Sequence, residues 1–312
     1  TTSTFTLKQG TDVILGSVSY SGNMASFTPN NPLLANAVFT ATITTGAKNV
    51  AGVSIANNYV WTFKTINSSN APNLGSASPF GAFGGNAGIT NQGINTVING
   101  SIATTAASTL VTGFHDATAI YTETPLNVGN VTGAIATAPP MPGTATSFAI
   151  AQQALLDANA AYLSISPASM PGGIDPGAGE LGGLTLAPGI YKSNSGTFNI
   201  SNGNLTLDAQ GDPNAVWIFQ TASGLTVGIA GPTGAKSVVL INGALPKNVF
   251  WYVGSTATIN GAGGGTMVGT IIANSGVTFS TAGNAVQTVL NGRALSLVSS
   301  VTMVNTTINV PQ

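Results

Sequence analysis

Hydroxyl side chains recur at matching positions in four short stretches of the chain: residues 225–231, 257–263, 277–283 and 301–307. The second residue of each stretch is a threonine: Thr226, Thr258, Thr278 and Thr302. A threonine hydroxyl both donates and accepts hydrogen bonds, and the β-branched side chain holds it in a stiff χ1. None of the four stretches contains a titratable side chain. We therefore expect these residues to organise hydrogen bonds at a surface rather than to transfer protons.

A β-strand is the element that would present these threonines regularly, because successive side chains point to opposite faces. The odd-numbered residues of the first stretch, Leu225, Val227 and Ile229, are apolar and are predicted to face inward. The alternate positions are small and uncharged, and Val304 is the one larger apolar residue among them. The predicted surface set is Thr226, Gly228, Ala230, Thr258, Asn260, Ala262, Thr278, Ser280, Ala282, Thr302 and Thr306.

The threonines follow one another after 32, 20 and 24 residues. Each coil of a three-sided parallel β-solenoid takes about that many residues, and neighbouring coils stack about 4.8 Å apart. Residues on one face of a strand repeat roughly every 6.6 to 6.8 Å. The pattern therefore predicts a mainly all-β solenoid that carries a two-dimensional grid of threonines.

The composition excludes several classes of partner. Only 5% of the 312 residues are charged, against about 25% in an average soluble domain. The net charge of −1 provides no electrostatic footprint for nucleic acid. The chain has no cysteine for thiolate metal sites, and no apolar run approaches the roughly 20 residues of a membrane span. The remaining polar surface must come from uncharged residues, among them 41 threonines.

The residues that could carry enzymatic chemistry are few and are better explained as structural. His115, the only histidine, lies beside Asp116, but the chain has neither a G-x-S-x-G elbow nor a cysteine to complete a triad. Residues 177–182 match a dinucleotide-binding pattern outside its strand-to-helix context. Asp208 and Asp212 lie in one turn-forming segment, where aspartate bonds its own backbone. We expect no enzyme activity, no cofactor and no metal site.

The chain divides into three parts. Alternating strand-like runs over 1–66 predict a small β-sandwich segment, and 67–73 is predicted to be a linker. From 74 to 312, short apolar runs alternate with Gly-, Asn- and Ser-rich turns, as a solenoid requires.

One segment of the third part predicts a helix, at about 146–163, because it is rich in Ala, Leu and Gln and free of Gly and Pro. Its N-cap is predicted at Thr146 or Ser147. Apolar residues at spacings of three and four form the predicted contact stripe: Phe148, Ala151, Leu155, Ala158 and Tyr162.

Several segments beyond residue 73 together resemble the microbial ice-binding proteins: 73–80, 89–102, 186–191, 205–220, 242–244, 248–254, 269–273 and 291–295. The resemblance implies a discontinuous right-handed β-solenoid beside a long helix, in which the N-terminal coil stacks next to C-terminal ones. It also implies adsorption to ice, thermal hysteresis and inhibition of ice recrystallisation. The family's T-A/G-x-T/N pattern matches at 281–284, and 221–224 fits only its first two positions. Segments 33–52 and 61–64 resemble the second half of bacterial Ig-like modules.

An ice crystal surface is therefore the predicted partner, reached without a cofactor, nucleic acid or membrane insertion. A charged group would hold its own hydration shell, and the predicted surface set contains none. The alternative is a structural or adhesive surface module that binds carbohydrate or another cell-surface partner. Both hypotheses predict a secreted or cell-surface protein, and the Ig-like segment predicts that the chain is part of a longer, surface-anchored one.

Overall fold

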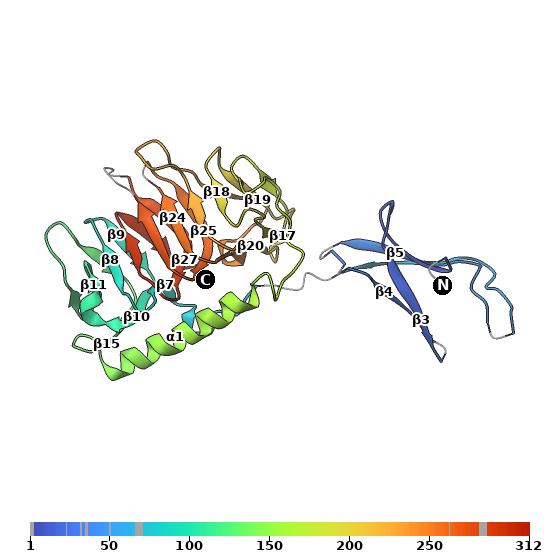
Figure 1. Cartoon of the computed structure of the whole chain (residues 1–312), viewed down its shortest axis with the longest axis horizontal. Coiled ribbons are helices and arrows are strands. Elements are labelled where there is room, and N and C mark those ends of the chain that lie inside the picture. The colour runs from blue at the N-terminus through green and yellow to red at the C-terminus, as the bar shows by residue number, and fades with distance from the viewer. Residues whose placement is uncertain are drawn as a thin grey trace. The chain divides into compact units, whose positions relative to one another are not determined.

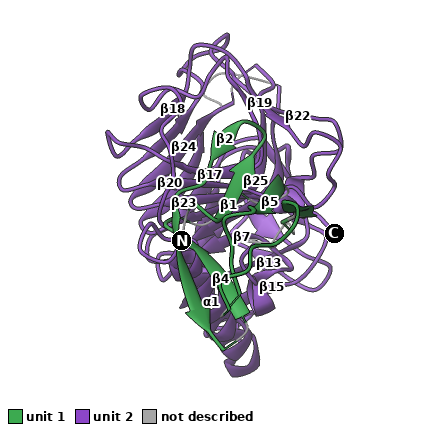
Figure 2. Cartoon of the chain, turned by 90° about the vertical axis from the view of Figure 1, so that its right-hand side faces the viewer, with its two compact units in different colours: residues 1–69 green, residues 70–312 purple. Residues whose placement is uncertain are grey.

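The computed structural model describes residues 3–22, 24–31, 33–34, 37–49, 51–65, 71–261, 263–280 and 286–312. The chain forms two compact units, residues 1–69 and 70–312 (Figure 2). The predicted linker lies largely outside the described residues. Within the described part of the chain, no helix combines the length and apolar character of a membrane span.

The first unit is an antiparallel β-structure. Its four-stranded sheet has the order β2-β1-β5-β6, and β3 pairs with β4 in a separate hairpin. The ring centroids of Phe27 in the hairpin and Phe5 in the sheet lie 5.6 Å apart, so the two layers are in aromatic contact. Phe39 of the sheet is fully buried. The strands are β1 (Phe5–Gln9), β2 (Asp12–Val13), β3 (Gly16–Ser21), β4 (Met24–Pro29), β5 (Val38–Ile43) and β6 (Tyr59–Lys64).

The second unit is a three-sided parallel β-solenoid, which confirms the predicted fold (Figure 1). One side, here called the threonine sheet, has the order β11-β8-β28-β26-β24-β21-β18. Its strands are β11 (Val111–Thr112), β8 (Ile89–Asn91), β28 (Val301–Met303), β26 (Gly276–Ser280), β24 (Thr256–Asn260), β21 (Leu225–Val227) and β18 (Phe198–Ile200).

The other two sides are a large sheet of 13 strands and a small sheet of three. The small sheet contains β16 (Thr185–Leu186), β19 (Leu205–Asp208) and β22 (Val238–Ile241). The main path of the large sheet contains β13 (Ile120–Tyr121), β12 (Phe114–His115), β14 (Gly129–Val131), β9 (Thr96–Asn99), β29 (Thr306–Asn309), β27 (Thr288–Ser296), β25 (Thr266–Ala273), β23 (Val249–Val253), β20 (Trp217–Thr221) and β17 (Gly189–Lys192). Beside that path lie β7 (Phe80–Gly84), β10 (Ser101–Ala107) and β15 (Ile135–Ala138). Short 3-10 turns occupy Gly75–Ala77, Ser108–Leu110 and Pro246–Asn248.

The coils do not stack in chain order. Strands β7, β8 and β9 of the first coil pair in parallel with β27, β28 and β29 of the last coils. These pairings supply hydrogen-bond partners to C-terminal strands that would otherwise end the stack. The discontinuous arrangement implied by the family resemblance is therefore present.

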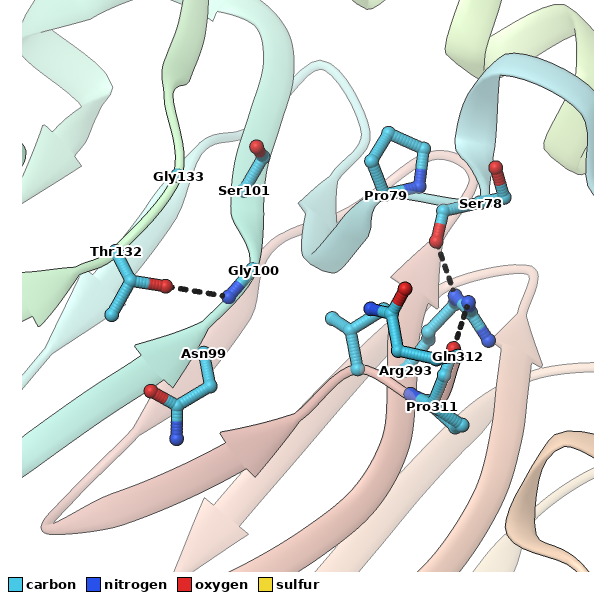
Figure 3. Close-up of a pocket in the computed structure, with 11 residues that line it drawn as sticks. Ser78, Pro79, Asn99, Gly100, Ser101, Thr132, Gly133, Arg293, Pro311 and Gln312 are labelled. Atoms are coloured by element: carbon cyan, nitrogen blue, oxygen red, sulfur yellow. Dashed lines mark hydrogen bonds between the residues drawn. The ribbon is translucent and has the colours of Figure 1, made fainter.

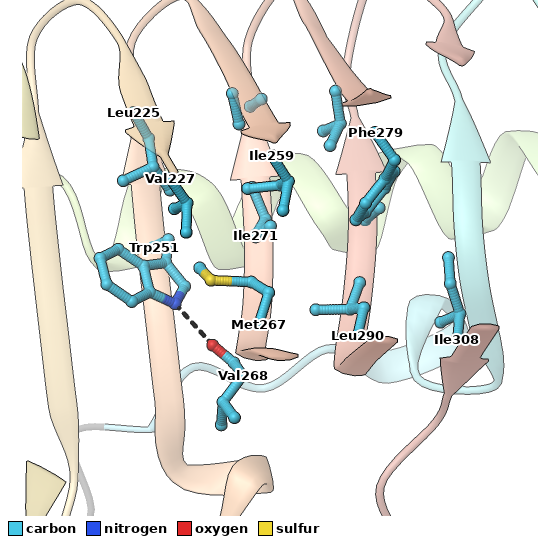
Figure 4. Close-up of a cluster of buried hydrophobic side chains, with 14 of the residues drawn as sticks. Leu225, Val227, Trp251, Ile259, Met267, Val268, Ile271, Phe279, Leu290 and Ile308 are labelled. Atoms are coloured by element: carbon cyan, nitrogen blue, oxygen red, sulfur yellow. Dashed lines mark hydrogen bonds between the residues drawn. The ribbon is translucent and has the colours of Figure 1, made fainter. Parts of the chain in front are cut away.

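The core lies between the threonine sheet and the large sheet. Leu225, Val227, Ile259 and Phe279 point inward from the former and meet Trp251, Ile271, Leu290 and Ile308 of the latter (Figure 4). Trp251 stacks on Phe219 with ring centroids 4.1 Å apart, and its Nε1 donates to the Val268 carbonyl at 2.9 Å. The inward face of each strand is thus fixed by large apolar side chains.

Helix α1 (Ala145–Ser164) lies alongside the solenoid (Figure 1). Its buried stripe consists mainly of alanines, which let the helix axis approach the sheet closely: Ala151, Ala154, Ala158, Ala161 and Tyr162. Tyr162 stacks on Tyr252 of β23 with ring centroids 4.1 Å apart. Phe148 and Leu155, which were predicted to belong to the contact stripe, are only half-buried. A second apolar cluster, distinct from the solenoid interior, therefore holds the helix.

The N-cap of α1 is Thr144, so the prediction of Thr146 or Ser147 is wrong. The Thr144 hydroxyl accepts from the Ser147 N–H at 3.0 Å, and the Ser147 hydroxyl accepts from the Thr144 N–H at 2.9 Å. Two backbone donors that the helix cannot satisfy are thereby paired.

We predict that Thr144→Ala lowers the free energy of unfolding by about 1 kcal/mol, because the reciprocal cap is lost. Thr146→Ala is the matched control, since exposed Thr146 makes no cap bond and its loss should change stability by less than about 0.5 kcal/mol. Urea denaturation of both variants gives the comparison. A larger cost for Thr146→Ala would place the helix start where the sequence predicted it.

Candidate functional site

A straight column of polar residues crosses the outer face of the threonine sheet. The strand register places directly side by side Asn199, Thr226, Thr258, Thr278, Thr302, Thr90 and Thr112. Thr278 is exposed and the others are half-exposed, while the residues on either side of them along each strand are buried. The structure thus brings together the four threonines that the sequence aligned and extends their column at both ends.

Thr90 and Thr112 are the two threonines of the column that the four aligned stretches did not include. Each follows a buried apolar residue, Ile89 or Val111, as the other threonines of the column do. Their strands are short and lie more than 100 residues upstream of the aligned stretches. An apolar residue followed by threonine is the sequence pattern that these two positions share with the other members of the column. Only the out-of-order stacking of the coils shows that Thr90 and Thr112 belong to it.

The face is widest at its centre, where β24 and β26 are five residues long. Thr256 lies one outward position before Thr258, is exposed, and was not predicted. Ser280 lies one outward position after Thr278 and is half-exposed, as predicted for a surface residue. In the strand register Thr256 lies beside Gly276 and Ser280 beside Asn260, so single hydroxyls flank the threonine column on two strands at its centre.

Thr306 does not lie on this face, and that prediction is wrong. Strand β28 ends at Met303, and Asn305 takes a positive φ of 43° before β29 begins on the large sheet. Thr306 is fully buried there, and its N–H donates to the Thr96 hydroxyl at 3.1 Å. The turn at Val304 breaks the two-residue alternation. Thr306 therefore does not face the same side as Thr302.

The predicted surface positions after β21 and at the end of β24 also need correction. Gly228 is buried with φ of +72°, which ends the strand, and the following Ile229 is 56% exposed rather than inward-facing. Ala230 is exposed but lies in the turn. Asn260 is only 9% exposed, and its Nδ2 donates to the Gly228 carbonyl at 3.3 Å. Ala262 and Ala282 lie outside the described residues, as does the motif at 281–284.

A carboxylate, Glu180, marks the end of the column at β18, where its backbone forms a bridge with Asn199. Burial alone would raise the pKa of Glu180. Hydrogen bonds to its carboxylate from the Ser201 hydroxyl and N–H and from the Gly182 N–H outweigh burial and leave the pKa below its usual range. The charge is thus used locally to hold the loop that covers the sheet edge.

Because its folded-state pKa is depressed, Glu180 contributes stability that is present above its unfolded pKa of about 4.5 and is lost as pH falls below it. We predict that Glu180→Gln lowers the melting temperature at pH 7. Between pH 7 and pH 3 the variant should lose less stability than the parent chain does. Thermal unfolding of both proteins across this range is the measurement, and parallel curves would contradict the assignment.

Three further acidic residues, Glu123, Asp208 and Asp212, and the histidine have structural partners. His115 Nδ1 lies 2.7 Å from Glu123 Oε1. Asp208 accepts from the Gln210 N–H and Asp212 from the Asn214 N–H, each at 2.8 Å, as turn residues do. Among the described residues, no three His, Cys, Asp or Glu side chains are grouped as a metal site would require.

Fold and face together define a three-sided β-solenoid protein that presents a regular, uncharged threonine surface. The chain belongs to the ice-binding-like family, whose model matches residues 83–309. Residues 1–65 match the model of a bacterial Ig-like domain. The resemblance inferred from sequence motifs is thereby confirmed.

Individual relatives cover most of the second unit. The ice-binding protein of Nostoc sp. (strain HG1) is 37% identical over 231 residues, which are 74% of this chain and 71% of that one. The ice-binding protein of Colwellia sp. is 32% identical over 250 residues, or 77% and 88% of the two chains. The solved ice-binding protein of the Antarctic ascomycete Antarctomyces psychrotrophicus is 31% identical with a TM-score of 0.59, and the alignment covers 78% of this chain and 99% of that one. An ice-binding protein from an Arctic yeast, whose structure was described as the basis of antifreeze activity, aligns with a TM-score of 0.62 and 29% identity over 79% and 96% of the chains.

Proposed function

We propose that this protein adsorbs to ice through the threonine sheet and thereby produces thermal hysteresis and inhibits ice recrystallisation. The observation that carries the proposal is the register that aligns six threonines on adjacent parallel strands: Thr226, Thr258, Thr278, Thr302, Thr90 and Thr112. Ice-binding relatives along most of the second unit support it.

The mechanism follows from the regular spacing of the threonine column. Each hydroxyl can donate and accept, so it fits either orientation of a neighbouring water, while each methyl group prevents water from collapsing onto the backbone. The buried partners of the threonines, such as Ile259 and Phe279, keep the strands rigid beneath them. Many weak contacts held at fixed spacing favour water ordered near an ice lattice plane over mobile water, without a cofactor or a chemical step.

Growth of a single ice crystal in a solution of the protein tests the proposal directly. Faceting of the crystal and a gap between its melting and freezing temperatures are expected. Unchanged crystal habit together with the absence of hysteresis would overturn it. Binding on a saccharide array would then favour the alternative adhesive role.

The Ig-like match of the first unit favours a second, compatible proposal: the ice-binding unit belongs to a longer extracellular protein attached to a cell surface. Ig-like domains in such proteins act as spacers between the surface and the binding unit. Cells of the source organism should then retain the protein in the cell-surface fraction and bind to ice. Recovery of the protein only from the culture medium would show a freely released antifreeze instead.

A further inference from the structure

A cavity of about 730 Å³ lies away from the threonine sheet, where the ends of β9 and β29 meet the centre of β27 (Figure 3). Segments far apart in the sequence form its wall, including Ser78, Asn99, Ser101, Thr132, Arg293 and Pro311. The cavity is large enough for a molecule the size of a monosaccharide. Nothing in the proposed adsorption to ice uses it.

Arg293, the only arginine of the chain, lines this cavity and is 6% exposed. Its Nε donates to the Ser78 carbonyl at 2.7 Å, and Nη2 donates to the Pro311 carbonyl at 3.1 Å (Figure 3). Nη1 makes a longer bond, 3.4 Å, to the Thr270 hydroxyl. A guanidinium has five N–H groups, so two remain without a hydrogen bond to a described residue.

All three acceptors of Arg293 are neutral. The one ion pair found within the described residues joins His115 to Glu123, elsewhere in the unit. A buried cation without an anion is costly, and burial lowers the pKa of Arg293 to about 10. A carboxylate bound in the cavity could accept two N–H bonds from the planar guanidinium and would offset its charge.

The rim of the cavity also offers donors. The Thr132 hydroxyl accepts from the Gly100 N–H at 3.1 Å, and the Ser101 hydroxyl accepts from the Ala134 N–H at 3.1 Å. A hydroxyl that accepts from the backbone still has its own proton to donate. Guanidinium and hydroxyl groups that line one cavity favour a ligand that only accepts hydrogen bonds, as an ionised carboxylate does.

We propose that this cavity binds a small carboxylate-bearing molecule, with its carboxylate on Arg293 and the hydroxyls of Ser101 and Thr132 as further donors. The site is separate from the threonine sheet, so a test of carboxylate binding is independent of a test of adsorption to ice. A simple carboxylate such as acetate and a sugar acid both carry the ionised carboxylate that this site would bind. The volume of the cavity accommodates either molecule.

The single arginine makes a specific test possible in the complete, unmodified chain. In the ¹⁵N-labelled protein, the Nε–Hε signal of Arg293 is the only one of its kind. We expect saturable movement of this signal on titration with sodium glucuronate, and none with glucose or sodium chloride at matched concentration. Movement with acetate as well would show a general carboxylate site, and movement with glucuronate alone would show a sugar-acid site. An unmoved signal, or equal movement with glucose, would overturn the proposal.

A variant provides an independent check. Thr132→Val keeps the side-chain shape and leaves Arg293 in place, so it should weaken glucuronate binding roughly tenfold by loss of a charge-assisted hydrogen bond. Thr206→Val, on the small sheet, is the matched control and should leave binding unchanged. Calorimetric titration measures both, and equal loss in the two variants would contradict a site at this cavity.

Discussion

Replacement of Thr278 by tyrosine is expected to remove most of the thermal hysteresis while the protein stays folded. Thr278 is the exposed member at the centre of the column, on β26 between Thr258 of β24 and Thr302 of β28. A tyrosine ring there would stand above the plane of the neighbouring threonines and hold an ice surface away from them. Because adsorption depends on many weak contacts made together, one protrusion at the centre should affect all of them.

The matched control is Thr206→Tyr. Thr206 is a half-exposed threonine on β19, the middle strand of the small sheet, so it introduces the same ring on another side of the same solenoid. Hysteresis should remain close to that of the parent chain, and circular dichroism should show the same fold for both variants. Full activity of Thr278→Tyr, or equal loss in the control, would show that the threonine sheet is not the ice-contacting face.

Replacement of Trp251 by alanine is expected to have the largest effect on stability, a loss of about 3–5 kcal/mol. Trp251 is fully buried, stacks on Phe219 and donates its indole N–H to the Val268 carbonyl. The substitution would therefore leave a cavity between the two facing sheets, remove an aromatic pair and remove the hydrogen bond to the Val268 carbonyl.

Leu156→Ala serves as the control, because Leu156 on α1 is 63% exposed and its truncation should cost less than about 0.5 kcal/mol. Urea unfolding followed by circular dichroism measures both variants. Trp251→Phe keeps most of the volume and should be intermediate, which leaves the test usable if the alanine variant does not fold. A loss below about 1 kcal/mol for Trp251→Ala would contradict the described core.

Much of the solenoid could be predicted from local patterns. Two-residue alternation identified the inward Leu225 and Val227 and the outward Thr226, because the faces of a strand are set by its own backbone. Helix α1 was found within a residue of its ends, since its composition and period are also local. Its cap was misplaced because Thr144, Thr146 and Ser147 are all acceptable caps, and only the two hydrogen bonds between Thr144 and Ser147 decide among them.

The candidate face was predicted less completely, for two reasons of tertiary origin. The turns at Gly228 and Asn305 end the strands earlier than alternation suggests, which leaves Gly228 buried and sends Thr306 into the large sheet. Thr90 and Thr112 join the column only because the first coil pairs with the last, over more than 200 residues of sequence. No local period carries that information.

The sequence by itself determined the β-solenoid with its helix, the lack of charge on the face and four aligned threonines, because strand alternation and composition are properties of short segments. Tertiary structure alone decided the order of the coils, the length of the column and the place of Arg293 between Ser78 and Pro311. Those features depend on hydrogen bonds between strands distant in the chain, whose pairing is set by the burial of the whole core.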